Sequence, residues 1–448
     1  MGRILKVLNT KKLLSIALPV SIQSLIQSSL GMIDQVMIGQ LGETAVAAVS
    51  LAGRPGFILI YTLCGITVAT SIFASQYEGA GDKSRHAQVM RSTIFGCLFF
   101  ALPFLLAAFL MPQILLGFFT HDNAVICAGT GYLKICSISY IPLIFIMACS
   151  AMLRSTGKAN IPMICGIVAV FVNTILNAVL IFGLLVFPTL GANGAAIATV
   201  ISHVVEAIIL IVYMQKIGHV GNVLQALKTR CPKEFIWTFF ITVLPAIGNE
   251  LLWALGDTGY AAIYGRMGTN QLAAMTLTFP IQCLTVGFFS GFSTAAGIII
   301  GNFLGGEKTK QAYIASWDFL KLCIIGCIGM GMLIVAFSGL YVRFYNVSEE
   351  VRLLTKQLLA IFAFFLWVKV SNMVMLGGVL RSGGQTKYTL FLDVLGTWGI
   401  GIPLGILGAF VFKLDMCLVY TLISIEECVR LILGLGIVKS KKWMKRLV

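Results

Sequence analysis

Residues 161–186 read IPMICGIVAVFVNTILNAVLIFGLLV, and no charged residue interrupts them. A helix that crosses the hydrocarbon core of a bilayer needs about 20 mainly apolar residues, so this stretch is long enough to span a membrane. The segments predicted to be spanning helices, this one included, are 13–35, 50–75, 93–117, 131–151, 161–186, 192–214, 235–258, 272–301, 316–341, 357–380, 388–412 and 416–438. Because unpaired backbone groups are costly in hydrocarbon and these segments are too long for barrel strands, the sequence predicts an all-α polytopic membrane protein with twelve transmembrane helices.

The composition supports a membrane protein. The 448 residues are 58% hydrophobic and 11% charged, whereas a soluble domain averages about 45–50% apolar and about 25% charged residues. Roughly a dozen spans leave no room for a large catalytic domain outside the membrane. The formal charge is +15, but the basic residues stand between hydrophobic segments rather than on one face of a polar domain. The bilayer is therefore the expected partner, and nucleic acid is not.

The basic residues also predict an orientation. If both termini and the even-numbered connections lie on one side, that side holds 22 Lys and Arg residues. The opposite side holds four, namely Arg266, Arg343, Arg352 and Lys413. By the positive-inside rule, both termini are expected in the cytoplasm. The first span follows a basic N-terminus and shows no small-residue cleavage site, so it is expected to be retained.

The chain repeats itself. A shift of 226 places Pro19 on Pro245, Gly65 on Gly291 and Gly79 on Gly305, and a shift of 227 places LRSTGK at 153–158 on LRSGGQ at 380–385. The sequence therefore predicts two pseudo-symmetric six-helix lobes of like orientation, which in transporters enclose the substrate path and rock against each other. The predicted boundaries are an N-lobe at 1–214, a cytoplasmic linker at 215–233 and a C-lobe at 234–448. The linker is expected to be a simple tether because it is basic, contains Pro232 and lacks apolar periodicity.

Polar residues inside the predicted spans of the first half are candidate site residues. Gln23, Gln27 and Asp34 follow one face of the first helix, which indicates a hydrated interior. A charge at mid-bilayer costs about 2.5–3.5 kcal/mol, so Asp34 needs a function, a partner or a position near the helix end where it can snorkel. The remaining candidates of this half are Asn173 and Asn177, one turn apart, and Thr199, Ser202, His203 and Glu206. Glu206 could carry a proton, or could simply pair with His203 at i, i+3.

The second half has its own polar set. Glu250, Trp253 and Asp257 share one face of the seventh helix, next to Asn249, and Lys369 lies in the middle of the tenth. A buried lysine is expected to lose its proton or to find an acid, and Glu250 or Asp257 is the natural partner, either in a purely structural pair or in a site that opens during transport. Asp393 on the eleventh helix completes the set. Glu426 and Arg430 are expected to neutralise each other at i, i+4, which leaves Glu427 unexplained.

Several motifs resemble those of the bacterial MATE (multidrug and toxin extrusion) family over essentially the whole chain. They are GMIDQVMIGQLG at 31–42, AVSLA before Pro55, QYEGAGD at 76–82 with its counterpart GNFLGGE at 301–307, and the twinned LRS-x-G motifs. The resemblance implies two lobes of six helices that export cationic, often aromatic compounds in exchange for protons or sodium ions. No cofactor and no resident metal are implied beyond a possible sodium ion, and the chain is expected to act as a monomer in the cell inner membrane.

The resemblance assigns roles to some positions. Asp34 matches the family's acidic residue on the first helix, which is thought to release substrate when protonated, and Asn173 matches an asparagine of the fifth. Asn177 stands where proton-coupled members often carry Asp, which weakens a site that needs two carboxylates. Lys369 replaces the acid that sodium-coupled members show, so their ion site does not transfer. The predicted coupling residues are Asp34, Glu206, Glu250 and Asp257, and the predicted substrate cavity contains Gln27, Asn173, Asn177, Thr199, His203, Asn249, Trp253, Lys369 and Asp393.

The sequence argues against three other kinds of protein. Relatives in the same superfamily flip lipid-linked oligosaccharides, but phosphate-bearing substrates favour an arginine-lined cavity, and acids outnumber bases in this interior. A major-facilitator protein is also built from six plus six helices, and GAGDKSR at 79–85 slightly mimics its loop motif, yet the mirrored motifs argue against it. An enzyme would need clustered metal ligands or a nucleophile with a base, whereas His86, His121, His203 and His219 are dispersed. The sequence favours an antiporter.

Overall fold

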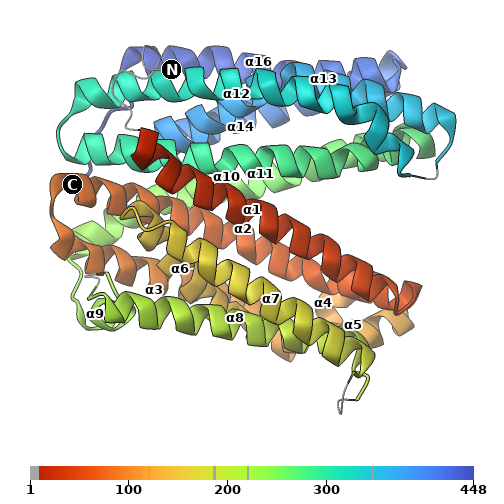
Figure 1. Cartoon of the computed structure of the whole chain (residues 1–448), viewed down its shortest axis with the longest axis horizontal. Helices are drawn as coiled ribbons and strands as arrows, with labels where there is room; N and C mark the ends of the chain where they lie inside the picture. The colour runs from red at the N-terminus through yellow and green to blue at the C-terminus, as the bar shows by residue number, and fades with distance from the viewer. Residues whose placement is uncertain (1–9, 121, 185–187, 219–220, 346) are drawn as a thin grey trace. The chain divides into compact units, whose positions relative to one another are not determined.

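The computed structural model describes residues 10–120, 122–184, 188–218, 221–345 and 347–448, without the side chains of Met32 and Glu43, and every regular element among them is helical (Figure 1). The first half contains α1 (Thr10–Gly39), α2 (Glu43–Ala80), the 3-10 turn η1 (Lys83–Arg85), α3 (His86–Leu110), α4 (Pro112–Gly117), α5 (Asn123–Ile138), α6 (Tyr140–Ser155), α7 (Asn160–Phe182), α8 (Gly191–Lys216) and α9 (Val223–Lys228). His121 and His219 lie outside the described residues.

The second half is built from α10 (Lys233–Met267), α11 (Thr269–Gly305), α12 (Thr309–Arg343), α13 (Glu349–Val374) with the π-helical η2 (Met375–Leu380), α14 (Thr386–Asp393), the π-helical η3 (Val394–Gly401), α15 (Ile402–Ile406), the π-helical η4 (Leu407–Val411) and α16 (Met416–Ser440). The π-helical segments interrupt the two predicted helices at 357–380 and 388–412. Such segments are rare and often occur at functional sites.

The described helices account for the predicted spans. Ten stretches are long and apolar enough to cross a membrane, and α5 with α6 forms an eleventh that bends by 42°. The twelfth is α16, which has 25 residues but carries Glu426, Glu427 and Arg430 in its apolar run. The predicted helix at 93–117 is broken between α3 and α4, because Pro112 disfavours helical geometry at Met111. The protein is thus an all-α polytopic membrane protein with a twelve-helix fold.

The helices form two compact units. The first unit contains residues 22–247. The second unit contains the described residues up to Ser21 together with residues 248–448. The divisions fall inside α1 and α10, each two residues after a proline, Pro19 or Pro245, that interrupts the helical ladder. Each unit therefore includes the first part of the long helix that continues into the other. The six-helix lobes predicted at 1–214 and 234–448 follow chain order and stay a prediction.

Two glycines at equivalent positions of the repeat pack against these first parts of α10 and α1. In the first unit, a Cβ on Gly65 of α2 would lie 2.6 Å from the Cα atom of Ile247. In the other unit, a Cβ on Gly291 of α11 would lie 2.8 Å from the backbone nitrogen of Ser21, and the Ser21 hydroxyl donates to the carbonyl of Phe288. Real Cβ atoms do not approach so closely, so both positions require glycine.

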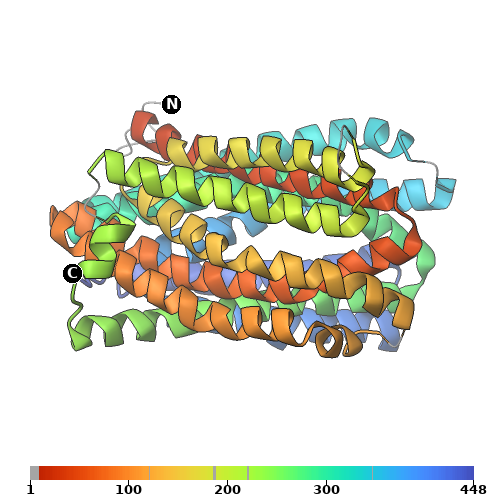
Figure 2. The ribbon, with the colours of Figure 1, turned by 90° about the horizontal axis from the view of Figure 1, so that it is seen from below.

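Helices α7 and α8 carry much of the polar inventory of the first unit, and they run side by side in opposite directions (Figures 1 and 2). Their contact is close because Gly194 has no side chain: a Cβ there would lie 2.6 Å from the Leu180 carbonyl oxygen. Small residues at such a contact let membrane helices approach each other and bring their polar groups within bonding distance.

The predicted tether at 215–233 contains more structure than expected. Residues 223–228 form the short helix α9, whose start is capped by the Asn222 side chain. Val223 and Ala226 are buried, and the Arg91 guanidinium of α3 donates a 2.8 Å hydrogen bond to the Leu227 carbonyl. The segment is therefore docked on its own unit, which the missing apolar periodicity did not predict.

Candidate functional site

The first unit holds a chain of polar side chains across three helices. The Asn177 amide of α7 donates a 2.7 Å hydrogen bond to the Asp34 carboxylate of α1 and also contacts Asn173 Oδ1 at 3.0 Å. Asn173 in turn lies 3.5 Å from the hydroxyl of Ser202 on α8. Asp34 is half-buried, whereas Asn173 and Asn177 are 2% and 1% exposed. The carboxylate thus faces a polar strip in an otherwise apolar bundle.

Three predicted cavity residues of this unit lie apart from that chain of bonds. The Thr199 hydroxyl donates to the Ala195 carbonyl of its own helix at 3.0 Å. The His203 ring bonds to the main chain of Ser139, and its Nδ1 atom has no hydrogen-bond partner among the described residues. Gln27 is exposed. These side chains do not join the Asp34 network.

Glu206 is buried deeper than Asp34, with 6% of its surface exposed. It interacts electrostatically with Arg154 of α6, while His203 turns to Ser139, so the two side chains expected to pair are directed to different partners. The Oε1 atom of Glu206 has no hydrogen-bond partner in the described part of the chain. A buried, incompletely bonded carboxylate next to an arginine can exchange a proton or another small cation.

The second unit holds a longer network of charged groups. Asn249, which is 3% exposed, donates a 2.5 Å hydrogen bond to Asp393 and accepts one from the Arg381 guanidinium. Arg381 also lies 2.9 Å from the Glu250 carboxylate. Glu250 is therefore paired with an arginine that follows η2, not with Lys369.

Arg430 lies at the centre of the same network. Its guanidinium donates to Asp393 at 2.8 Å and to Glu426 at 2.5 Å, and it lies 3.5 Å from Glu427. The Tyr260 hydroxyl donates to Glu426 at 2.7 Å, and the Asn372 amide donates to Glu427 at the same distance. Glu426 thus has partners besides Arg430, and Glu427, unexplained by the sequence, is held by Asn372.

The four carboxylates of the network, Glu250, Asp393, Glu426 and Glu427, face two guanidinium groups, Arg381 and Arg430. Buried charges require opposite charges and complete hydrogen bonding to be tolerated. Because negative groups outnumber positive ones, the network can accept a proton or a small cation without accumulating positive charge.

Three predicted site residues, Trp253, Asp257 and Lys369, are not among the members of the Arg381 and Arg430 network described above. Asp257 is exposed and interacts electrostatically with half-buried Lys369, which makes Asp257 the acid that faces this lysine. Trp253 of α10 is 46% exposed and offers aromatic surface.

Sequence reasoning missed Arg381, Tyr260 and Asn372. Arg381 follows the predicted span at 357–380 directly, yet its side chain is 14% exposed and bonds to Asn249 and Glu250. The available signal was the twinned LRS-x-G motif, which gives each half an arginine at an equivalent place, Arg154 and Arg381. Tyr260 and Asn372 carried no such signal, because their roles depend on how α10 and α13 pack against α16.

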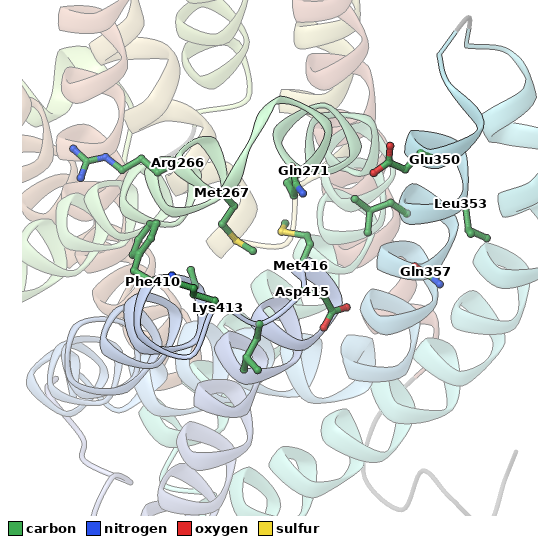
Figure 3. A pocket seen from close by; sticks show the side chains of 13 residues that line it. Arg266, Met267, Gln271, Glu350, Leu353, Gln357, Phe410, Lys413, Asp415 and Met416 are labelled. Atoms are coloured by element: carbon green, nitrogen blue, oxygen red, sulfur yellow. The ribbon is translucent and has the colours of Figure 1, made fainter.

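A pocket lies at the other end of the second unit, where α10 ends and α11, α13 and α16 begin (Figure 3). It has a volume of about 470 Å³. Charged, thioether and aromatic groups line it, among them Arg266, Glu350, Phe410, Lys413, Asp415 and Met416. None of the predicted site residues lines this pocket.

Comparisons with known proteins agree with the two-half architecture. The MatE family model matches residues 19–179 and 245–407. The uncharacterized transporter YisQ of Bacillus subtilis is 25% identical over 439 residues, which cover 98% of this chain and 95% of that protein. The probable multidrug resistance protein NorM of Thermotoga maritima is 23% identical over 445 residues, with 98% and 94% covered.

Solved structures share the fold. A crystal structure of a MATE protein in complex with MaL6 superposes with a TM-score of 0.86 at 18% identity and covers 99% of both chains. An outward-facing MATE-family multidrug resistance transporter of the MOP superfamily gives a TM-score of 0.85 at 18% identity, with 98% of both chains covered. With a family model that matches both halves, the chain belongs to the MatE family of multidrug efflux transporters, and it is a multi-pass membrane transporter and not an enzyme.

Proposed function

We propose that this protein is a secondary antiporter that exports small cationic or aromatic compounds, drugs or toxic metabolites, in exchange for protons or sodium ions. The observation that carries the proposal is the Asp34 carboxylate, which lies half-buried among apolar helices and is held by Asn177 at 2.7 Å. A carboxylate in such a place binds either a cationic substrate or a coupling cation, because a charge in the membrane interior must be compensated.

Competition for that charge is sufficient for coupling. When a proton or a sodium ion neutralises Asp34, the attraction for a cationic substrate falls, and by linkage the substrate weakens ion binding by the same factor. Glu206, Glu250 and Asp257 are the further coupling candidates, and Trp253 offers the aromatic surface that attracts organic cations. The cycle proceeds by alternating access and needs no cofactor beyond the coupling ion.

The substitution Asp34→Asn tests this proposal. The amide oxygen can still accept the Asn177 hydrogen bond, so the variant is expected to fold and reach the membrane while it lacks the charge. Cells that produce it should lose resistance to ethidium down to the level of cells without the transporter. Asp82→Asn is the matched control, because Asp82 is exposed and pairs with Arg85 on the same turn. Full resistance in Asp34→Asn at equal membrane abundance would refute the assignment.

The flippase alternative is less well supported. A lipid-linked oligosaccharide carries phosphate groups and needs uncompensated arginine or lysine side chains. The buried arginines of the second unit are instead engaged, Arg381 by Asn249 and Glu250, and Arg430 by three carboxylates. This arrangement supports a cationic substrate rather than a phosphate-bearing one.

We also propose that the protein acts as a monomer in the cytoplasmic membrane, with both termini in the cytoplasm. The asymmetric distribution of Lys and Arg between the connections supports this orientation.

A further inference from the structure

Three residues from three helices of the first unit meet at one buried point. A Cβ built on Gly166 of α7 would have as its nearest neighbours Gln23 Nε2 of α1 at 3.6 Å and Glu206 Oε1 of α8 at 3.8 Å. Gln23 and Glu206 are 7% and 6% exposed, and the Oε1 atom of each lacks a hydrogen-bond partner among the described residues. A buried polar group without a partner costs about 1–3 kcal/mol, so an unpaired acceptor on each of two side chains beside Gly166 indicates a missing donor or cation.

The internal repeat identifies the residues of the second half that correspond to Gln23, Gly166 and Glu206. The shifts of 226 and 227 place Gln23 on Asn249 and Gly166 on Asp393, and Glu206 and Arg430 stand equally far from the ends of α8 and α16. In the second unit these counterparts bond to one another: Asn249 and Arg430 both donate to Asp393, at 2.5 and 2.8 Å. The first unit thus has Gly166 where the second unit has the Asp393 carboxylate. The side chains beside Gly166, Gln23 and Glu206, each keep an oxygen without a hydrogen-bond partner among the described residues.

We propose that the space beside Gly166 is a binding site for one small monovalent cation, a proton on Glu206 or a sodium ion held by Glu206 and the side-chain amide of Gln23. The inference rests on the proposed antiport and adds an ion site to the carboxylate at Asp34. The ionisable groups that face Glu206 are Arg154 from α6 and Cys165 from α7. The positive charge of Arg154 opposes tight cation binding, which keeps the bound ion exchangeable, as transport requires.

The site is distinct from the Asp34 carboxylate but lies on the same polar strip. Asp34 and Gln23 are eleven residues apart on α1, as are Asn177 and Gly166 on α7. At 1.5 Å per residue this separation is about 16 Å along the helices. The contact between Asn173 and Ser202 lies between the two ends.

The substitution Gly166→Ala tests the site with little disturbance of the fold. The added methyl group would make contacts of 3.6 and 3.8 Å, which are ordinary van der Waals distances, while it takes the space of the ion. Gly96→Ala is the matched control, because Gly96 is a buried helix glycine of the same unit whose Cβ would lie 3.6 Å from Ile66. Gln23→Leu and Glu206→Gln remove the two ligands separately and carry the test if Gly166→Ala fails to fold.

Two titrations of the purified full-length protein distinguish the ions. Sodium chloride is titrated calorimetrically in choline chloride buffer of constant ionic strength, and pH is titrated while the infrared carboxyl band is followed. The wild type and Gly96→Ala should show a sodium affinity, or a carboxyl titration that Glu206→Gln removes. Gly166→Ala and Gln23→Leu should weaken that affinity at least tenfold, or move that titration by at least one pH unit.

The site is refuted if the wild type shows neither response, or if Gly166→Ala, Gln23→Leu and Glu206→Gln all respond like the wild type. Asp34→Asn separates this failure from failure of the proposed function. If Asp34→Asn abolishes export while the Gly166 variants bind ions normally, the antiport stands and the Gly166 site falls. If Asp34→Asn exports normally, the proposed function falls first.

Discussion

At the scale of single residues, the buried charges are explained by their partners. Arg430 would be prohibitively costly in the interior alone, yet it bonds to Asp393 and Glu426 and lies beside Glu427. Close approach is possible because η3 presents glycine to these groups: a Cβ on Gly396 would lie 2.6 Å from Arg430 Nε. A buried network of this kind is strongly sensitive to the loss of one member, because the remaining charges stay buried.

We therefore expect Arg430→Met to lower the free energy of unfolding by about 3–5 kcal/mol, the usual cost of breaking a buried ion pair. Arg446→Met is the control, because the Arg446 pair with Glu307 is largely exposed and such pairs contribute about 0–1 kcal/mol. Thermal unfolding of both variants in detergent, compared with the wild type, measures the difference. Equal unfolding temperatures for Arg430→Met and Arg446→Met would contradict the structural account of the network.

The sequence identified several polar residues of these networks but not the residues that link them. The spacing of Asn173 and Asn177 predicts that both lie on one helix face, and in the structure Asn177 of that face donates to Asp34. The sequence predicts Glu250 or Asp257 as the acid for Lys369, and Asp257 is the one that faces it. The Arg381 contacts could not be predicted, because they depend on where the chain after η2 turns back toward α10.

At the scale of helices, glycine decides how closely neighbours pack. Gly65 and Gly291 occupy equivalent positions in the repeat, and each lies against the helix start that its unit receives from the other half of the chain. The repeat in the sequence revealed that these glycines correspond. It could not reveal their purpose, because the exchange of helix starts is a property of packing and not of periodicity.

Gly291→Ala should destabilise the protein by about 1–3 kcal/mol, because the new Cβ would overlap the backbone of Ala17 and Ser21. Gly297→Ala lies on the same helix, where the nearest atom to the new Cβ would be 3.6 Å away, and should have little effect. The unfolding temperatures of the two purified variants provide the comparison. A loss of stability in Gly297→Ala as large as that in Gly291→Ala would show that helix propensity, not the close contact, governs these positions.

The helices themselves were largely predictable, and their irregularities were not. Hydropathy placed every span, yet it gave no indication of the break at Met111, the bend between α5 and α6, or the π-helical segments η2, η3 and η4. At Gly401 of η3, for example, an added Cβ would overlap the Tyr260 hydroxyl and the Glu426 carboxylate, so the packing there depends on distant residues. Local sequence carries little of that information.

At the scale of the whole molecule, the charge of +15 and the buried carboxylates belong to different functions. In the proposed orientation most basic residues fall on the cytoplasmic side, where such residues orient membrane helices and attract anionic lipid headgroups. The interior networks have the opposite balance, with more carboxylates than guanidinium groups in the second unit. The composition alone suggested a basic protein, whereas the sites are acidic.

The expected orientation leads to a prediction about the end of the chain. With twelve spans and both termini in the cytoplasm, alkaline phosphatase fused after Val448 should be inactive, and a green fluorescent protein fused there should fluoresce. Each reporter folds on only one side of the membrane, so the two give opposite signals. An active phosphatase at this position would contradict the cytoplasmic C-terminus.

Transport in inverted membrane vesicles tests most directly whether this protein exchanges exported substrate for an inward-moving cation at Asp34. Proton and sodium gradients are imposed separately, with the ion concentrated inside the vesicle, and ethidium accumulation is measured for the wild type and Asp34→Asn. We predict that at least one gradient drives accumulation in the wild type and that neither does so in Asp34→Asn. Accumulation that needs no ion gradient, or that persists in Asp34→Asn, would contradict the account.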